Sequence, residues 1–291
     1  MLFRSIAGRT SSSNTGGSVE IASGEGSSAN SGNIHLYTAN AGSTGVSGML
    51  VFSSGTTSAG NSGAIQIGTG TATGGRGGTL ELTVGAGTSG TGGIMRMYAG
   101  DSSAATGGAM YIETGHGSIS SSGLLSIRTA NAGTTGVSGA LIFSSGTSSG
   151  GDSGSLSIGS GAATGGKGGD VSLTVGSGNT GSGGFLSIRA GTTTADTGGN
   201  LEIASGDSTK KTSGNIHINT PNAGISGISG MLVFSSGTTS AGNSGAIQIG
   251  TGTATGGRGG TLELTVGAGR SGTGGIMRMY AGDSSAATGG A

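Results

Sequence analysis

Residues 63–107 read GAIQIGTGTATGGRG, GTLELTVGAGTSGTG and GIMRMYAGDSSAATG, which are three fifteen-residue units laid head to tail. Each unit opens on a glycine, continues through a segment in which every second residue is apolar, and meets a second glycine seven residues after the first. Small polar residues then lead to the next unit. A fixed period of this length indicates a repeat protein, and it decides the fold before any single motif does.

The opening glycine recurs along almost the whole chain. In all 18 complete units Val, Ile, Leu, Met or Phe stands two and four residues after it, so that 36 of 36 positions are apolar. The residue six after it is always small or β-branched. This alternation predicts extended strands with one apolar face, and the glycines are expected to supply positive φ angles at tight corners. The opening glycines are Gly17, Gly32, Gly48, Gly63, Gly78, Gly93, Gly108, Gly123, Gly139, Gly154, Gly169, Gly184, Gly199, Gly214, Gly230, Gly245, Gly260, Gly275 and Gly290.

The composition limits the choice of fold class. Of 291 residues 72 are glycine, and only 31% are hydrophobic, which argues against a conventional globular core. A single proline and the lack of a three-residue period argue against collagen. Intrinsic disorder is the main alternative, because glycine and serine are typical of flexible linkers. The unbroken series of apolar positions argues against it, since a linker has no need of them.

A longer pattern lies over the fifteen-residue period. The units that open at Gly32, Gly123 and Gly214 have sixteen residues and lie 91 residues apart, so six units form a super-repeat. In these long units an Asn-Ala-Gly sequence follows an alanine or proline that replaces the second glycine. We interpret it as a bulge, and a lateral contact with a partner is the alternative. The asparagines of these turns are Asn40, Asn131 and Asn222.

Two longer blocks of the chain are almost identical. Residues 48–109 and 230–291 differ only at one position, which is Thr88 in the first block and Arg270 in the second. The first block starts two super-repeats, or 182 residues, before the second, so the unit of two super-repeats begins again at Gly230.

The charged residues favour one arrangement of the strands. Eight acidic residues have Arg, Lys or His fifteen positions later, and none has one thirty positions later. Opposite charges on neighbouring strands stabilise a sheet, so we expect these pairs to be direct neighbours. They are Glu20 with His35, Glu81 with Arg96, Asp101 with His116, Glu113 with Arg128, Asp152 with Lys167, Asp196 with Lys211, Glu202 with His217, and Glu263 with Arg278.

These observations together predict an all-β fold, a parallel β-solenoid with about one coil per fifteen-residue repeat and a 91-residue super-repeat of six coils. Residues 1–16 are expected to form an irregular first rung or cap, and residues 17–291 a continuous solenoid array. Ile65 is then expected inside the stack, where an aspartate would destroy local order. The sequence ends at Ala291, directly after the opening glycine of a new repeat. We expect the stack to continue in further sequence or in the next subunit.

No motif indicates catalysis or a cofactor. The histidines occupy places in the charge pattern, and no Ser-His-Asp set or metal-ligand spacing accompanies them. The glycine-rich stretches 74–78 and 165–169 lack the Gly-Lys-Ser/Thr of a phosphate-binding loop. Twelve basic and twelve acidic residues cancel without a basic stripe, which argues against nucleic acid as a partner. The apolar runs are too short for membrane insertion. We therefore expect a protein that is not an enzyme and needs no cofactor or metal.

Residues 38–56 combine Thr-Ala-Asn-Ala-Gly with Gly-Val-Ser-Gly-Met-Leu-Val-Phe-Ser-Ser-Gly-Thr. This combination resembles long Gly/Ser-rich repeat proteins of stramenopile protists such as diatoms and oomycetes. The resemblance implies a secreted, cell-surface or extracellular-fibre setting, with the shaft of a flagellar hair as one concrete role.

The sequence thus predicts a structural protein of an extracellular filament, fibre or sheath that self-assembles head to tail. The sequence is also compatible with lateral self-association and with O-linked glycans on its many serines and threonines. An adhesive or carbohydrate-binding surface stalk is one alternative function. An ice-binding solenoid is another, although the outward positions Gln66, Glu81, Arg96 and Tyr111 are too mixed for a flat threonine array.

Overall fold

The computed structural model describes residues 5–11, 15–285 and 289–290. None of these residues lies in a helix or a β-strand, so there are no element bounds to give. The described chain is coil-like and non-helical. The predicted parallel β-solenoid is therefore wrong, and so is any other β fold for this part of the chain.

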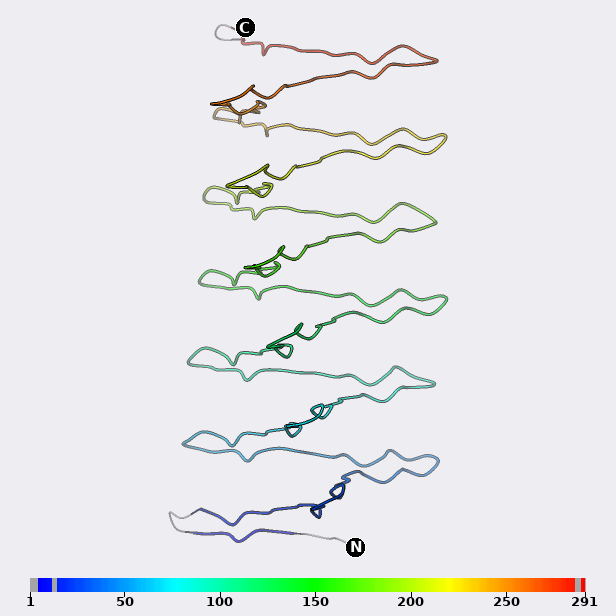
Figure 1. Ribbon diagram of the computed structural model, residues 1–291, viewed down its shortest axis with the longest axis vertical. Helices are drawn as coiled ribbons and strands as arrows, with labels where there is room; N and C mark the ends of the chain where they lie inside the picture. The colour runs from blue at the N-terminus through cyan, green and yellow to red at the C-terminus, as the bar shows by residue number, and fades with distance from the viewer. Residues whose placement is uncertain (1–4, 12–14, 286–288, 291) are drawn as a thin grey trace. The chain divides into compact units, whose positions relative to one another are not determined.

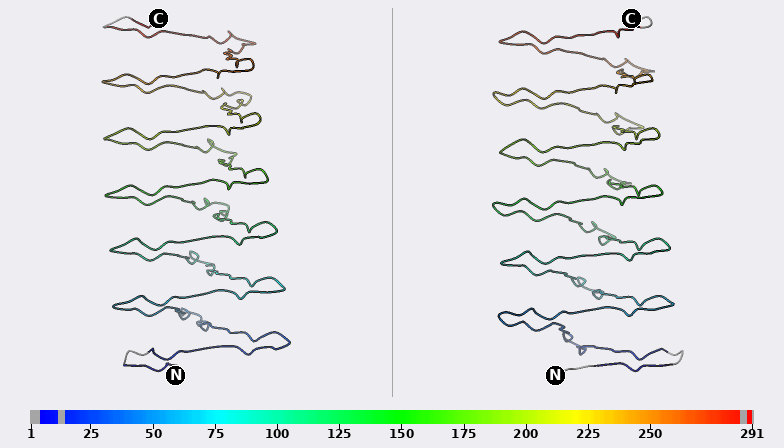
Figure 2. Two further views of the ribbon diagram at one scale, coloured as in Figure 1. Left: turned by 60° about the vertical axis from the view of Figure 1, so that its left-hand side comes forward. Right: turned by 180° about the vertical axis from the view of Figure 1, so that it is seen from behind.

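The fifteen-residue period nevertheless has a structural counterpart. In each unit an extended segment, which carries the apolar positions, is followed by a narrow loop that folds back on itself (Figures 1 and 2). The loop of the first complete unit, residues 24–32, is closed where the N–H of Gly32 donates to the carbonyl of Gly24 at 2.9 Å. We call these two parts the apolar segment and the closed loop.

The same closing bond recurs from unit to unit. It joins the opening glycine of one unit to the second glycine of the unit before it, at 2.8–3.4 Å. Further examples are Gly93 with Gly85, Gly108 with Gly100, Gly123 with Gly115, Gly199 with Gly191, Gly214 with Gly206, Gly275 with Gly267 and Gly290 with Gly282. In other loops a threonine hydroxyl closes the neck instead. Thr38 Oγ1 donates to the carbonyl of Gly48 at 3.0 Å, and Thr69 Oγ1 donates to that of Gly78 at 3.3 Å.

At several loop necks, close approach explains why the opening residue is glycine. A Cβ atom on Gly78 would lie 3.1 Å from the Cβ of Thr69, and one on Gly48 would lie 3.3 Å from that of Thr38. Thr69 and Thr38 are the small or β-branched residues six positions into their units. The expected positive φ angles are a wrong prediction, since Gly181, with φ of 75°, is the only described residue that has one.

The tip of the closed loop takes more than one form. At the position two residues after the second glycine, some loops carry Ser or Thr, whose hydroxyl accepts from backbone N–H groups of the bend. Ser208 Oγ accepts from Lys211 at 2.9 Å, and Ser148 Oγ accepts from Gly151 at 3.1 Å. Other loops carry glycine there. A Cβ on Gly117 would lie 2.5 Å from the carbonyl oxygen of Ser120, so only glycine fits.

The long units add a turn to this plan. Their loops contain a tight turn closed by hydrogen bonds from Gly45 to Gly42, from Gly136 to Gly133 and from Gly227 to Gly224, at 3.2–3.4 Å. Asn40, Asn131 and Asn222 each lie two residues before the first glycine of the turn. The turn therefore follows the Asn-Ala-Gly sequence, and the extra residue is accommodated within the loop.

The local character of these bonds is the physical reason that no sheet forms in the described part of the chain. A β-ladder needs a second extended segment about 4.8 Å away along its whole length. Here the twelve backbone hydrogen bonds between described residues all join residues at most nine positions apart. A folded protein has roughly one internal hydrogen bond per residue. At nine described opening glycines the N–H is bonded within the loop, and no backbone hydrogen bond between described residues joins two extended segments.

The chain divides into two units, Met1–Phe143 and Ser144–Ala291, and each contains the same alternation of apolar segments and closed loops. The proposed rung or cap at 1–16 falls partly outside the described residues, which leave out 1–4 and 12–14. Within it, Gly8 accepts from the N–H of Gly17 at 2.9 Å, as in the regular units.

Candidate functional site

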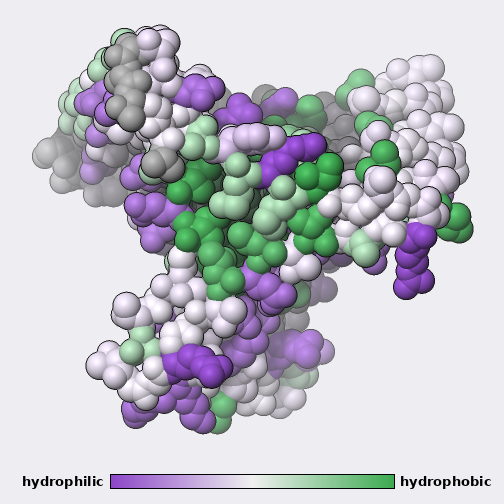
Figure 3. Space-filling model, turned by 90° about the horizontal axis from the view of Figure 1, so that it is seen from above, coloured by the Kyte–Doolittle hydropathy of each residue, from purple (hydrophilic) through white to green (hydrophobic). Residues whose placement is uncertain are grey.

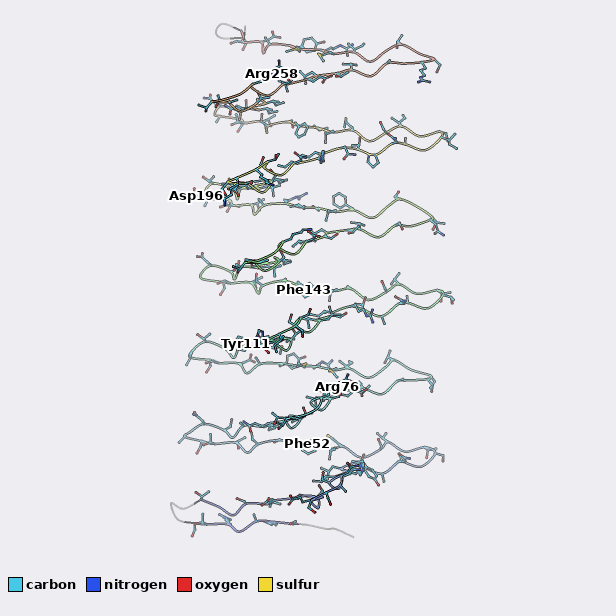
Figure 4. The ribbon with its side chains drawn as sticks, viewed as in Figure 1. Phe52, Arg76, Tyr111, Phe143, Asp196 and Arg258 are labelled. Carbon is cyan, nitrogen blue, oxygen red and sulfur yellow. The ribbon has the colours of Figure 1, made fainter. Side chains whose placement is uncertain are left out.

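The most distinctive surface of the chain is the set of apolar side chains on the extended segments. We call the 36 positions two and four residues after each opening glycine the apolar face. Every one of them is exposed, from 48% at Leu50 to 85% at Met279. Phe52 and Phe143, labelled in Figure 4, lie on such segments and are 63% and 57% exposed. Figure 3 shows one face on which hydrophobic residues cluster and hydrophilic residues surround them.

The total accessible surface shows how unusual this exposure is. The chain of 27.0 kDa has 28793 Å² of accessible surface. A folded monomer of this mass exposes about 11,000 Å², and its fully unfolded chain about 39,000 Å². None of the described residues is buried. The chain alone therefore forms no hydrophobic core among these residues, and their apolar side chains are available to a partner.

The opposite side of some extended segments is polar, whereas the opposite side of segment 48–54 carries the apolar residues Met49 and Val51. Thr83 Oγ1 donates to Glu81 Oε1 at 3.3 Å, and the hydroxyls of Ser172 and Thr174 lie 3.2 Å apart. Residues two apart on an extended backbone share a side. In both segments the contacting residues stand three and five positions after the opening glycine, so these two positions lie on one side. The apolar face and a polar face thus alternate along one segment.

No ion pair between described residues joins the two members of a predicted charge pair. The one ion pair between described residues joins Lys167 Nζ to Asp170 Oδ1 at 3.0 Å, with both side chains more than 80% exposed. Lys167 was expected to pair with Asp152. Likewise, no ion pair joins Glu20 to His35, Glu81 to Arg96, Asp101 to His116, Glu113 to Arg128, Asp196 to Lys211, Glu202 to His217 or Glu263 to Arg278 in this part of the chain.

The described histidine and charged side chains are exposed. His35, His116 and His217 are all on the surface. Within the described ranges, no three His, Asp or Glu side chains are grouped so that they could hold a metal ion. This part of the chain also holds no helix that could span a lipid bilayer. Arg76 and Arg258, in the duplicated loops, and Asp196, in loop 191–199, are likewise exposed (Figure 4).

The long units offer one small concavity. A hollow of about 320 Å³ is lined by Arg128, Thr129, Ala130 and Asn131. It includes one of the three asparagines predicted to form lateral contacts. Asn40 and Asn222 are exposed like Asn131. Whether these three residues contact a partner stays a prediction.

Sequence reasoning missed the closed loops and the role of their side chains. A signal was present at the position two residues after the second glycine, where serine, threonine and glycine recur. Serine and threonine hydroxyls often accept from backbone N–H groups two or three residues further on, which marks a self-contained turn. That pattern could have predicted loops that close locally.

Comparisons with known proteins give no match, whether with protein-family models, with curated proteins or with solved structures.

Proposed function

We propose that this chain is a non-enzymatic structural protein, a subunit or segment of an extracellular filament, fibre or sheath in which copies cover one another's apolar faces. The observation that carries the proposal is the exposure of all 36 regularly spaced apolar positions. Burial of apolar surface is worth roughly 25 cal/mol per Å². A chain that leaves this surface in water gains most of its stabilisation from association.

The repeat favours an extended assembly over a single small partner. Stable protein interfaces bury about 1,200–2,000 Å², with larger areas in obligate complexes. The chain exposes far more than one such interface would cover, at intervals of fifteen or sixteen residues from end to end. A partner that covers it must carry apolar groups with the same period. A second copy of the chain has that period because its sequence is the same.

The charge balance is compatible with this assembly. Twelve basic and twelve acidic residues leave no net charge at neutral pH. Copies therefore do not repel one another through a large net charge of one sign. The resemblance of residues 38–56 to repeat proteins of stramenopile surfaces and fibres supports the extracellular location.

The two alternative functions have weaker support. An ice-binding array requires a rigid solenoid to hold its threonines flat, and the described chain has no solenoid. An adhesive or carbohydrate-binding stalk remains an expectation from the sequence, with no observed feature that favours it over a filament.

The test compares two variants that add the same charge to opposite faces. The first replaces Ile65, Ile67, Ile247 and Ile249 with Asp and so places four carboxylates on the apolar face. The matched control replaces Ala64, Gln66, Ala246 and Gln248 with Asp on the polar face of the same segments. All eight positions are exposed in the single chain, so neither variant has a core to lose.

Assembly is followed by sedimentation and by electron microscopy as the concentration rises. We expect the unmodified chain and the control to form filaments, and the apolar-face variant to need a several-fold higher concentration. An unmodified chain that stays monomeric at high concentration would refute the proposal. Equal assembly of the two variants would show that another surface holds the copies together.

A further inference from the structure

The duplicated blocks suggest how the copies are arranged. We propose that neighbouring chains associate with an offset of two super-repeats, so that residues 48–109 of one copy dock beside residues 230–291 of the next. We call these block A and block B. This inference rests on the proposed function, because it specifies the register of the filament.

Blocks A and B have the same local structure. The neck of loop 70–78 is closed by Thr69 and Gly78 at 3.3 Å, and the equivalent bond from Thr251 to Gly260 is also 3.3 Å. On the polar face, Thr83 donates to Glu81 at 3.3 Å. Its counterpart Thr265 donates to Glu263 at 3.2 Å. The described residues of each block therefore form the same loops and segments.

Their apolar faces are also similarly exposed, except that Met97 is 62% and its counterpart Met279 is 85% exposed. Ile65 and Ile247 are 54% and 52% exposed. Leu80 and Leu262 are both 54% exposed, and Phe52 and Phe234 are both 63% exposed. A surface that accepts block A thus meets the same side chains at the same spacing when it meets block B. The chain offers two equivalent docking surfaces that lie two super-repeats apart in the sequence.

An offset converts this duplication into a filament. Copies that pair in register meet through identical patches, and such an association closes into a small oligomer. Copies that pair with an offset use two different patches, and a contact of this kind propagates into an open assembly unless it closes into a ring. With an offset, block A of each copy remains open to a further copy after its block B is covered. Propagation needs no additional surface.

The one difference between the blocks favours the offset. Side-by-side pairing in register places Arg270 of one copy beside Arg270 of the other. With the offset, Arg270 lies beside Thr88, and the like-charge contact is removed. All other charged residues are common to the two blocks, so within the blocks the two arrangements differ in charge at this position alone.

The chain has no cysteine, which allows a clean cross-linking test. Isotopically heavy Thr88→Cys chains are assembled with light Arg270→Cys chains and treated with a short bismaleimide. We expect cross-links between unlike chains to exceed those between like chains several-fold. The matched control mixes Thr88→Cys with Asn179→Cys, since Asn179 has the same place in its loop one super-repeat further on. This mixture is expected to give few cross-links between unlike chains.

The other outcomes separate the two proposals. Filaments in which Thr88→Cys chains cross-link mainly to one another would show pairing in register and overturn the offset. Equal cross-linking of Thr88→Cys with Arg270→Cys and with Asn179→Cys would show that the register is not fixed, which also overturns it. An absence of filaments in electron micrographs of the same mixtures would refute the proposed function itself.

Discussion

Single glycines set the path of the chain at the neck of each closed loop. A Cβ on Gly93 would collide with Cγ1 of Val84, whereas one on the adjacent Gly92 would have nothing within 4 Å. The sequence showed that the first position is always glycine but suggested the wrong reason. A positive φ and a close approach both select glycine, and the residue pattern does not distinguish them. The distinction needs the neighbour across the neck, which lies nine residues earlier.

A substitution with a rescue tests this interpretation. Gly93→Ala should open the neck of loop 85–93, because overpacking costs about 1–3 kcal/mol and the single closing hydrogen bond stabilises by only about 0.5–1.5 kcal/mol. Loss of nuclear Overhauser contacts between residues 84 and 93 measures the opening. Val84→Ala in the same chain should restore them, since the colliding methyl is then gone. Gly92→Ala is the control, and equal loss in that variant would contradict the proposed collision.

The closed loop is the element that the sequence predicted least well. The strands that period two predicts are not formed in the described part of the chain, although Thr83 and Glu81 do lie on one side of their segment. With one coil per repeat, the sequence predicts that the small polar residues complete the coil, whereas they form the closed loops. Whether such residues close on themselves or continue along a stack depends on a few weak hydrogen bonds, and composition alone does not decide between them.

The loop tip at Ser208 allows a test of whether a side-chain hydroxyl stabilises the closed loop. Its hydroxyl oxygen accepts from the N–H groups of Lys210 at 3.4 Å and Lys211 at 2.9 Å. Ser208→Ala removes the acceptor, and loss of a hydrogen bond worth about 0.5–1 kcal/mol should speed amide exchange at Lys211 about two- to fivefold. Ser208→Thr should keep the slower rate. The adjacent Thr209→Ala should also leave it unchanged, and faster exchange in that variant would argue against a specific role for Ser208.

For the whole chain, the sequence identified the apolar side chains that need to be covered but not what covers them. It placed Ile65 inside a stack of coils from the same chain, and Ile65 is 54% exposed. The error has a physical cause. A period of apolar residues is satisfied equally well by neighbouring repeats of one chain and by repeats of another copy, because the buried area is similar in both cases. The sequence of one chain does not show whether its own repeats or those of another copy cover the apolar residues.

This view leads to a prediction for the isolated chain at concentrations too low for association. A compact domain of 291 residues has a radius of gyration of about 19 Å, and an unfolded chain of that length about 60 Å. Because the chain exposes 28793 Å² and has no described helix or strand, X-ray scattering should give a value well above the compact limit, and circular dichroism should show neither helix nor sheet. Ile65→Asp should leave both measurements unchanged while it weakens association, since this side chain is already in water. A dilute monomer with a compact radius and a strand spectrum, lost in Ile65→Asp, would show instead that the chain buries its apolar face by itself.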